Sequence, residues 1–192
     1  WNLRRDLFKD KTVRLALAHL LNRDLLNEKF RFGMSLPATG PWYQQSDYAD
    51  PNVKAIPFDA DKANQLLKKA GWVDADKNGI LEKTINGKKT EFVFTLLYGN
   101  KETEKYWSLY QDDLKKVGIK MDMQIMEWNT FITKLDEADF DAVAMAWTGG
   151  DVDIDPKQIW HSSSAVKGGS NFVGYKNPEV DALIEKARGE LD

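Results

Sequence analysis

The stretch FDAVAMAWTGGDVDIDP, residues 140–156, decides the fold. Its first half is a short apolar run from Phe140 to Trp147, which is typical of a buried strand in an α/β sheet. The run then ends at Thr148 and two glycines, which expose backbone amides, and aspartates follow as far as Pro156. Because ligands of open α/β sheets bind beyond the carboxyl ends of the strands, we expect this loop to form part of a binding surface.

The rest of the chain predicts further strands that alternate with helices. Strands are expected at 91–98, 119–126 and 140–147, with connecting helices at 102–117 and from Asn129 onward. This β-α-β-α-β order predicts adjacent parallel strands. Other expected elements are helices at 10–32, 59–70, 157–161 and 178–188, a hairpin with turns at 77–79 and 86–87, and a long loop at 34–58. The sequence therefore predicts one α/β domain over residues 1–192, with a mainly parallel sheet flanked by helices.

Composition excludes several functional classes. Of the 192 residues, 42% are hydrophobic and 30% are charged, with a formal net charge of −3, which is typical of a globular protein and unlike a nucleic-acid-binding surface. No apolar run is long enough for a membrane helix. The absence of cysteine excludes disulfides and thiolate metal sites. We expect a monomer without a cofactor or a nucleic-acid partner.

Motifs for covalent catalysis are missing from the sequence. It has two histidines, no G-x-S-x-G elbow and no glycine-rich phosphate loop. We therefore expect that the protein is not an enzyme. The alternative is a carbohydrate-active α/β enzyme that uses Asp151 and Asp153 as its carboxylate pair, although residues this close on one loop rarely hold the separation which that chemistry needs.

The turn DADKNGILE, residues 74–82, leaves two interpretations open. Its oxygen-bearing side chains follow the spacing of the first half of a calcium loop; they belong to Asp74, Asp76, Asn78 and Glu82. Ile85 stands where such a loop places its last carboxylate. The turn is therefore either a plain hairpin turn or a weak calcium site, and we expect no other metal site.

Eight segments in order resemble one family. They are FKDKTVRLALAHLLNRDLL, PATGP, FDADKANQLLKKAGW, DADKNGILE, LKKVGIKM, MEWNTFITKL, DFDAVAMAW and NFVGYKNPEVDALI. Together they resemble the extracytoplasmic solute-binding proteins of peptide-type ABC importers, the oligopeptide- and dipeptide-binding family known as solute-binding family 5.

This resemblance implies a periplasmic-binding-protein-like type II lobe. Members of the family have two lobes that enclose the ligand, and this chain resembles the second lobe, without the first lobe or the final return of the chain. The implied partners are a small peptide and the membrane permease of an ABC importer. The implied location is outside the cytoplasm, in the periplasm or lipid-anchored on the outer face of the membrane.

The resemblance also implies ligand-binding residues. Trp128 and Trp147 match tryptophans that contact peptide in the family, and either Asp151 or Asp153 takes the part of an aspartate that meets the peptide amino terminus. Plain core packing is the alternative for both tryptophans. The residues themselves suggest further ligand contacts, from the backbone amides of Thr148 and Gly149 and from Trp42, an aromatic residue in a surface loop. Asn171 either faces the ligand or caps a turn. An oligosaccharide is the alternative ligand, since tryptophan faces with Asp and Asn also suit sugars.

Overall fold

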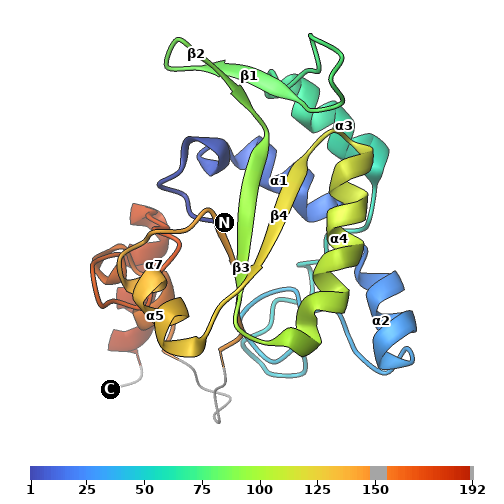
Figure 1. Cartoon of the computed structure of the whole chain (residues 1–192). Helices are drawn as coiled ribbons and strands as arrows, with labels where there is room; N and C mark the ends of the chain where they lie inside the picture. The colour runs from blue at the N-terminus through green and yellow to red at the C-terminus, as the bar shows by residue number, and fades with distance from the viewer. Residues whose placement is uncertain (148–154, 191–192) are drawn as a thin grey trace. The chain divides into compact units, whose positions relative to one another are not determined.

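The computed structural model describes residues 1–147 and 155–190 (Figure 1). The chain divides into two compact units. Unit 1 comprises Trp1–Lys9, Phe94–Lys101 and Met123–Asp192, and unit 2 comprises Asp10–Val93 and Glu102–Asp122.

The helices are α1 (Lys11–His19), α2 (Arg23–Arg31), α3 (Ala60–Lys69), α4 (Glu104–Lys116), α5 (Trp128–Asp136), α6 (Lys157–Trp160) and α7 (Pro178–Gly189). The strands are β1 (Glu82–Ile85), β2 (Lys88–Glu91), β3 (Val93–Tyr98), β4 (Lys120–Ile125) and β5 (Ala142–Ala144). Among the described helices, none has the length and apolar character needed to cross a bilayer.

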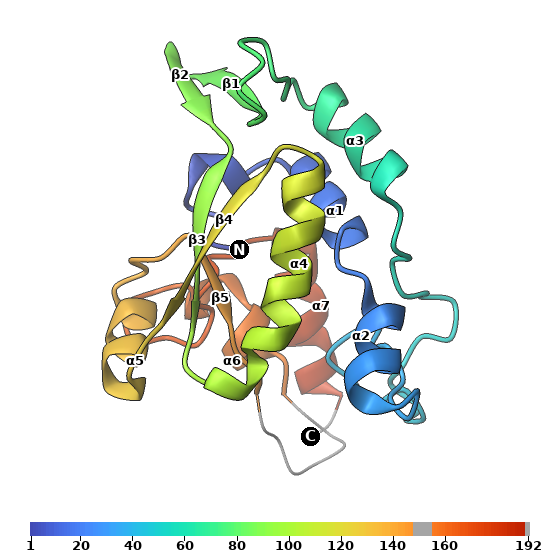
Figure 2. The ribbon, with the colours of Figure 1, turned by 45° about the vertical axis from the view of Figure 1, so that its right-hand side comes forward.

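The main sheet has the strand order β4-β3-β5 (Figure 2). Strands β3 and β5 are parallel, with Leu96 opposite Ala142 and Tyr98 opposite Ala144. On the other side of β3, the carbonyls of Phe92 and Tyr98 accept the amides of Lys120 and Met126, and the equal steps along both segments make this pair parallel as well. The predicted α/β class with a parallel sheet is therefore confirmed.

The core of unit 1 is a cluster of four buried side chains from β3, α5 and the segment before β5. These side chains belong to Leu97, Phe131, Leu135 and Phe140. Partly buried residues pack against the cluster, including Met126 and Phe172. The fully buried Asn2 ties the N-terminal segment to this core, since its side-chain amide donates to the carbonyls of Ala138 and Phe140.

In unit 2, α1 packs against α3 and presents Val13, Ala16 and Leu17 to the core. The buried hydroxyl of Tyr110 donates to the Leu17 carbonyl at 2.9 Å. The hairpin of β1 and β2 turns at Asn86 and Gly87, as predicted, and both residues have positive φ.

Three predicted elements were wrong in their extent. The single helix expected at 10–32 is two helices, because α1 ends at His19 and the Asn22 side chain caps a new helix by accepting the Leu25 amide. The strand expected at 91–98 is divided between β2 and β3 at Phe92. The strand expected at 140–147 is paired only over Ala142–Ala144. That residues 1–192 form a single lobe stays a prediction.

Candidate functional site

The candidate site lies in unit 1, where the parallel strands end. The Tyr98 carbonyl accepts the Met126 amide at 2.9 Å, and Tyr98 pairs with Ala144 on its other side. Because parallel strands end at the same edge of a sheet, the residues that follow β3, β4 and β5 emerge side by side. We use the name strand-end surface for the residues that follow these strands, namely Gly99 after β3, Trp128 after β4 and Trp147 after β5.

Trp128 is the first residue of α5, and contacts with neighbouring residues fix the position of its ring. The Glu127 carboxylate accepts the amides of Asn129 at 2.9 Å and Thr130 at 3.3 Å, which fixes the first turn of α5. The Trp128 indole stacks on Phe131 with a centroid distance of 5.8 Å. It also lies over Gly99, where an added Cβ would be 3.4 Å from the Trp128 ring. Even so, Trp128 is 58% exposed.

Trp147 has the same kind of support. Its ring is parallel to that of Phe172, with an interplanar angle of 1° and a centroid distance of 5.7 Å. Phe172 in turn packs against the core cluster of unit 1. Trp147 is 49% exposed. Each of the two tryptophans therefore stacks on a phenylalanine of unit 1 and has about half of its surface exposed to solvent, so neither is a plain core residue.

Asn171 supports this arrangement and is 1% exposed. Its side-chain nitrogen donates to the carbonyls of Tyr175 at 2.8 Å and His161 at 3.2 Å, and its oxygen accepts the Tyr175 amide. These bonds fix the turn that carries Phe172, on which Trp147 stacks. The structure therefore favours the turn alternative for Asn171.

The remaining predicted ligand residues lie either outside the described residues or in unit 2. Thr148, Gly149, Asp151 and Asp153 lie outside the described residues. Trp42 is in unit 2, where it is half-buried and its ring lies 5.5 Å from that of Tyr48.

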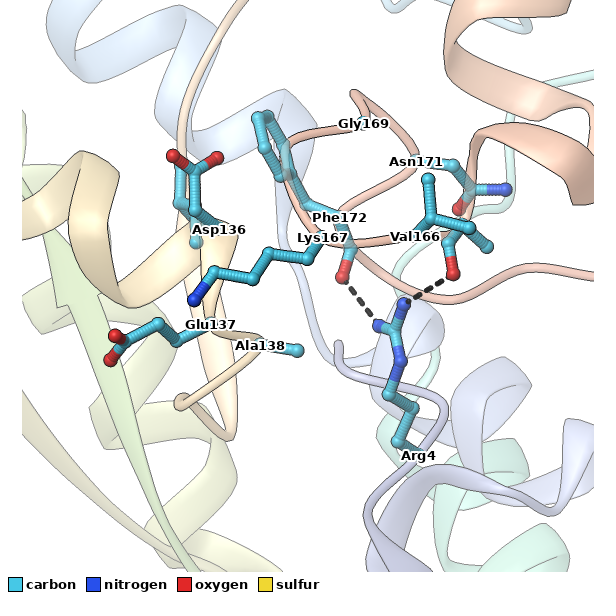
Figure 3. A pocket seen from close by; sticks show the side chains of 11 residues that line it. Arg4, Asp136, Glu137, Ala138, Val166, Lys167, Gly169, Asn171 and Phe172 are labelled. Carbon is cyan, nitrogen blue, oxygen red and sulfur yellow. Dashed lines mark hydrogen bonds between the residues drawn. The ribbon is translucent and has the colours of Figure 1, made fainter.

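A cavity of about 290 Å³ lies between the end of α5 and the segment 165–172 in unit 1 (Figure 3). The guanidinium of Arg4 donates to the carbonyls of Phe172 at 2.8 Å and Ala165 at 3.4 Å. Lys167 extends toward the side of the cavity that carries Asp136 and Glu137 (Figure 3). Because the Arg4 donors are directed at main-chain carbonyls, we assign Arg4 a structural role in holding this segment.

A second cavity in unit 1 has a volume of about 250 Å³ and carries the charged side chains of Arg5, Lys134, Asp139 and Asp141. Lys134 and Arg5 both bind the Asp139 carboxylate, and the hydrogen bond from Lys134 is the main reason that the pKa of Asp139 lies below its usual value. Asp141 accepts the Thr95 amide at 3.1 Å. The positive and negative side chains in this cavity therefore pair with one another, and the Asp141 bond stabilises β3.

Sequence reasoning missed the residues that support the tryptophans. Phe131 follows Trp128 by three residues, so helical spacing could have placed both rings on one side of α5. Phe172 is far from Trp147 in the sequence, and no local pattern connects them.

The α/β fold is that of the bacterial solute-binding proteins. The structure of the oligopeptide-binding protein AppA from Bacillus subtilis in complex with a nonapeptide matches 97% of this chain and 37% of that one, with a TM-score of 0.86 and 37% identity. The oligopeptide-binding protein from Thermus thermophilus complexed with pentapeptide matches 95% of this chain and 33% of that one, with a TM-score of 0.83 and 28% identity.

The family model described as bacterial extracellular solute-binding proteins, family 5 middle, matches residues 1–169. The chain therefore belongs to this family. In sequence it is 36% identical to the oligopeptide-binding protein AppA of Bacillus subtilis (strain 168) over the whole chain, which spans 35% of the length of that protein. The family is one of binding proteins, in agreement with the expectation that the chain is not an enzyme, and the relatives named here are named for peptides rather than for sugars.

Proposed function

We propose that this chain supplies part of the peptide-binding surface of a solute-binding protein that serves an ABC importer. The observation that carries the proposal is the pair of half-exposed tryptophans on the strand-end surface. Membership of family 5 and the similarity to oligopeptide-binding proteins support a peptide as the ligand.

The chemistry of the surface fits a peptide. Each indole stacks on a phenylalanine, at an interplanar angle of 26° for Trp128 and 1° for Trp147, so little side-chain entropy is lost when a ligand covers its open face. An apolar or cationic side chain gains from contact with such a ring. In this proposal, Asp151 or Asp153 receives the peptide amino group, the amides of Thr148 and Gly149 bind peptide carbonyls, and Trp42 makes a further contact.

The whole protein acts outside the cytoplasm in this proposal, in the periplasm or anchored by a lipid. Peptide is enclosed in a cleft between two lobes, and the closed protein delivers it to a membrane permease. Closure removes water from both faces of the ligand, so the chain described here contributes one part of the total affinity.

Nuclear magnetic resonance of the indole N–H groups tests the proposal, because each tryptophan gives its own signal. The chain is titrated to several millimolar with a mixture of nonapeptides, and in a parallel sample with an oligosaccharide of similar mass. We expect peptide to shift the signals of Trp128 and Trp147 and to leave that of the buried Trp72 in place. Equal shifts with oligosaccharide, or peptide shifts that spare both exposed indoles, would contradict the proposal.

A further inference from the structure

The turn between α3 and β1 in unit 2 arranges oxygen atoms around one point. The Asp74 carboxylate accepts the Gly79 amide at 3.0 Å, the Asp76 carboxylate accepts the Asn78 amide at 3.2 Å, and the Asn78 side chain accepts the Ile80 amide at 2.8 Å. Gly79 has φ +86°, a conformation that only glycine adopts without strain. These bonds fold residues 74–80 into a tight loop with its polar side chains held in defined positions.

Glu82 provides the second, independent observation. It is 6% exposed, and one of its carboxylate oxygens accepts the amides of Ala75 at 3.0 Å and Asp76 at 3.3 Å. The other oxygen, Oε2, is buried and has no hydrogen-bond partner among the described residues. Burial of a carboxylate oxygen without a hydrogen-bond donor lowers the free energy of unfolding, and a cation bound to this atom would offset that loss.

The Glu82 carboxylate is directed into the loop. One carboxylate oxygen from each of Asp74, Asp76 and Glu82 lies within 4.8 Å of the others. Oxygens of this spacing can contact one cation at the roughly 2.3–2.6 Å typical of calcium.

One side chain already places a positive charge at this point. The Lys89 ammonium from β2 lies 2.5 Å from Asp76 and 3.5 Å from the partnered oxygen of Glu82. Lys89 remains 53% exposed on its side chain, so it can turn outward without disturbing the core. Three carboxylates facing one ammonium leave a net negative charge in the loop.

We propose that this turn binds a divalent cation of the calcium type, with oxygen ligands from Asp74, Asp76, Asn78 and Glu82. The ligand set contains oxygen only, which suits calcium and disfavours zinc or copper. Without the cation, the Lys89 ammonium pairs with Asp76 and Glu82, and it is displaced when the cation binds. The site lies in unit 2 and depends on none of the observations that support the peptide site.

The expected affinity is modest. Ile85 stands where calcium loops of this spacing carry a two-oxygen carboxylate, and Lys89 has to be displaced. We therefore expect a Kd of about 0.1–1 mM, the range of extracellular calcium modules. In about 10 mM calcium chloride, Tm should rise by roughly 3–11 °C relative to sodium chloride of equal ionic strength.

Thermal unfolding and terbium luminescence test the site. Trp72 is two residues from Asp74 and can sensitise a bound terbium ion. The Asp74→Asn and Asp76→Asn variants should lose both signals, and the matched control Asp112→Asn, on the exposed side of α4, should keep them. Lys89→Met should bind calcium about tenfold more tightly, because the competing ammonium is gone.

The Lys89→Met variant keeps all four proposed ligands, so it tests calcium binding even if an aspartate variant does not fold. Absence of both the Tm shift and the luminescence in the native chain and in Lys89→Met would overturn the proposal. An equal Tm shift in magnesium chloride of the same concentration would overturn its assignment to calcium.

Discussion

The side chain of Asn2 holds the N-terminal segment of unit 1 in place through three hydrogen bonds. Asn2 is fully buried, and its side-chain nitrogen donates to the carbonyls of Ala138 at 3.0 Å and Phe140 at 2.9 Å, while its oxygen accepts the Arg4 amide at 3.1 Å. Asn2→Ala removes these three bonds, although the Phe140 carbonyl keeps the hydrogen bond from Arg5 Nε at 3.0 Å. At about 1 kcal/mol for each bond, the free energy of unfolding should fall by roughly 3 kcal/mol.

Urea unfolding followed by tryptophan fluorescence measures this change, and Tm should fall by roughly 6–12 °C for a chain of this size. The control is Asn52→Ala, at an exposed position of unit 2, which should change the free energy of unfolding by less than about 0.5 kcal/mol. Asn2→Asp should cost at least as much as Asn2→Ala, because a carboxylate would face two carbonyls. A loss in Asn2→Ala as small as in the control would refute the reasoning that Asn2 ties the N-terminal segment to the segment before β5.

Two further predictions concern a buried hydroxyl and an exposed carboxylate. Tyr110→Phe should lower the free energy of unfolding by about 1–2 kcal/mol, because the Leu17 carbonyl loses a buried donor; urea unfolding checks this, and an unchanged value would contradict it. The pKa of Asp139 is lowered by Lys134 and Arg5, so its stabilising contribution is present above the unfolded pKa of about 3.9 and is lost as pH falls through the lower folded pKa. Asp139→Asn should therefore reduce the loss of stability between about pH 5 and pH 2, and an identical pH profile in variant and native chain would show that these ion pairs contribute nothing.

The order of elements was predictable because their signals are local. Asp59 caps α3 and Asn177 caps α7, as their side-chain types predict, and the strand-helix alternation around Phe140 indicated the parallel sheet. The long helix at 10–32 was wrong because Leu20, Leu21 and Asn22 continue a helical pattern, while the Asn22 side chain competes for the backbone.

The site was predictable in part. The strand-to-loop change after Trp147 pointed to the carboxyl edge of the sheet, and the family resemblance pointed to Trp128. The stacking of Trp147 on Phe172 depends on a contact between residues far apart in the sequence, which no local period reports. The burial of Asn171 depends on the same fold-level packing, and so its structural bonds could not be told from ligand contacts in advance.

The central claim is that Trp128 and Trp147 contact peptide. Its most direct test is the affinity of the chain for a nonapeptide mixture, measured from the initial slope of the peptide-induced shifts in backbone amides, for the native chain, Trp128→Ala and Trp147→Ala. The control is Phe32→Ala, which removes a ring that is 82% exposed in unit 2. We predict a millimolar Kd for the native chain, a slope about tenfold smaller in each tryptophan variant from the loss of ~1.4 kcal/mol of stacking, and no change in the control. Native slopes in both tryptophan variants would contradict the account.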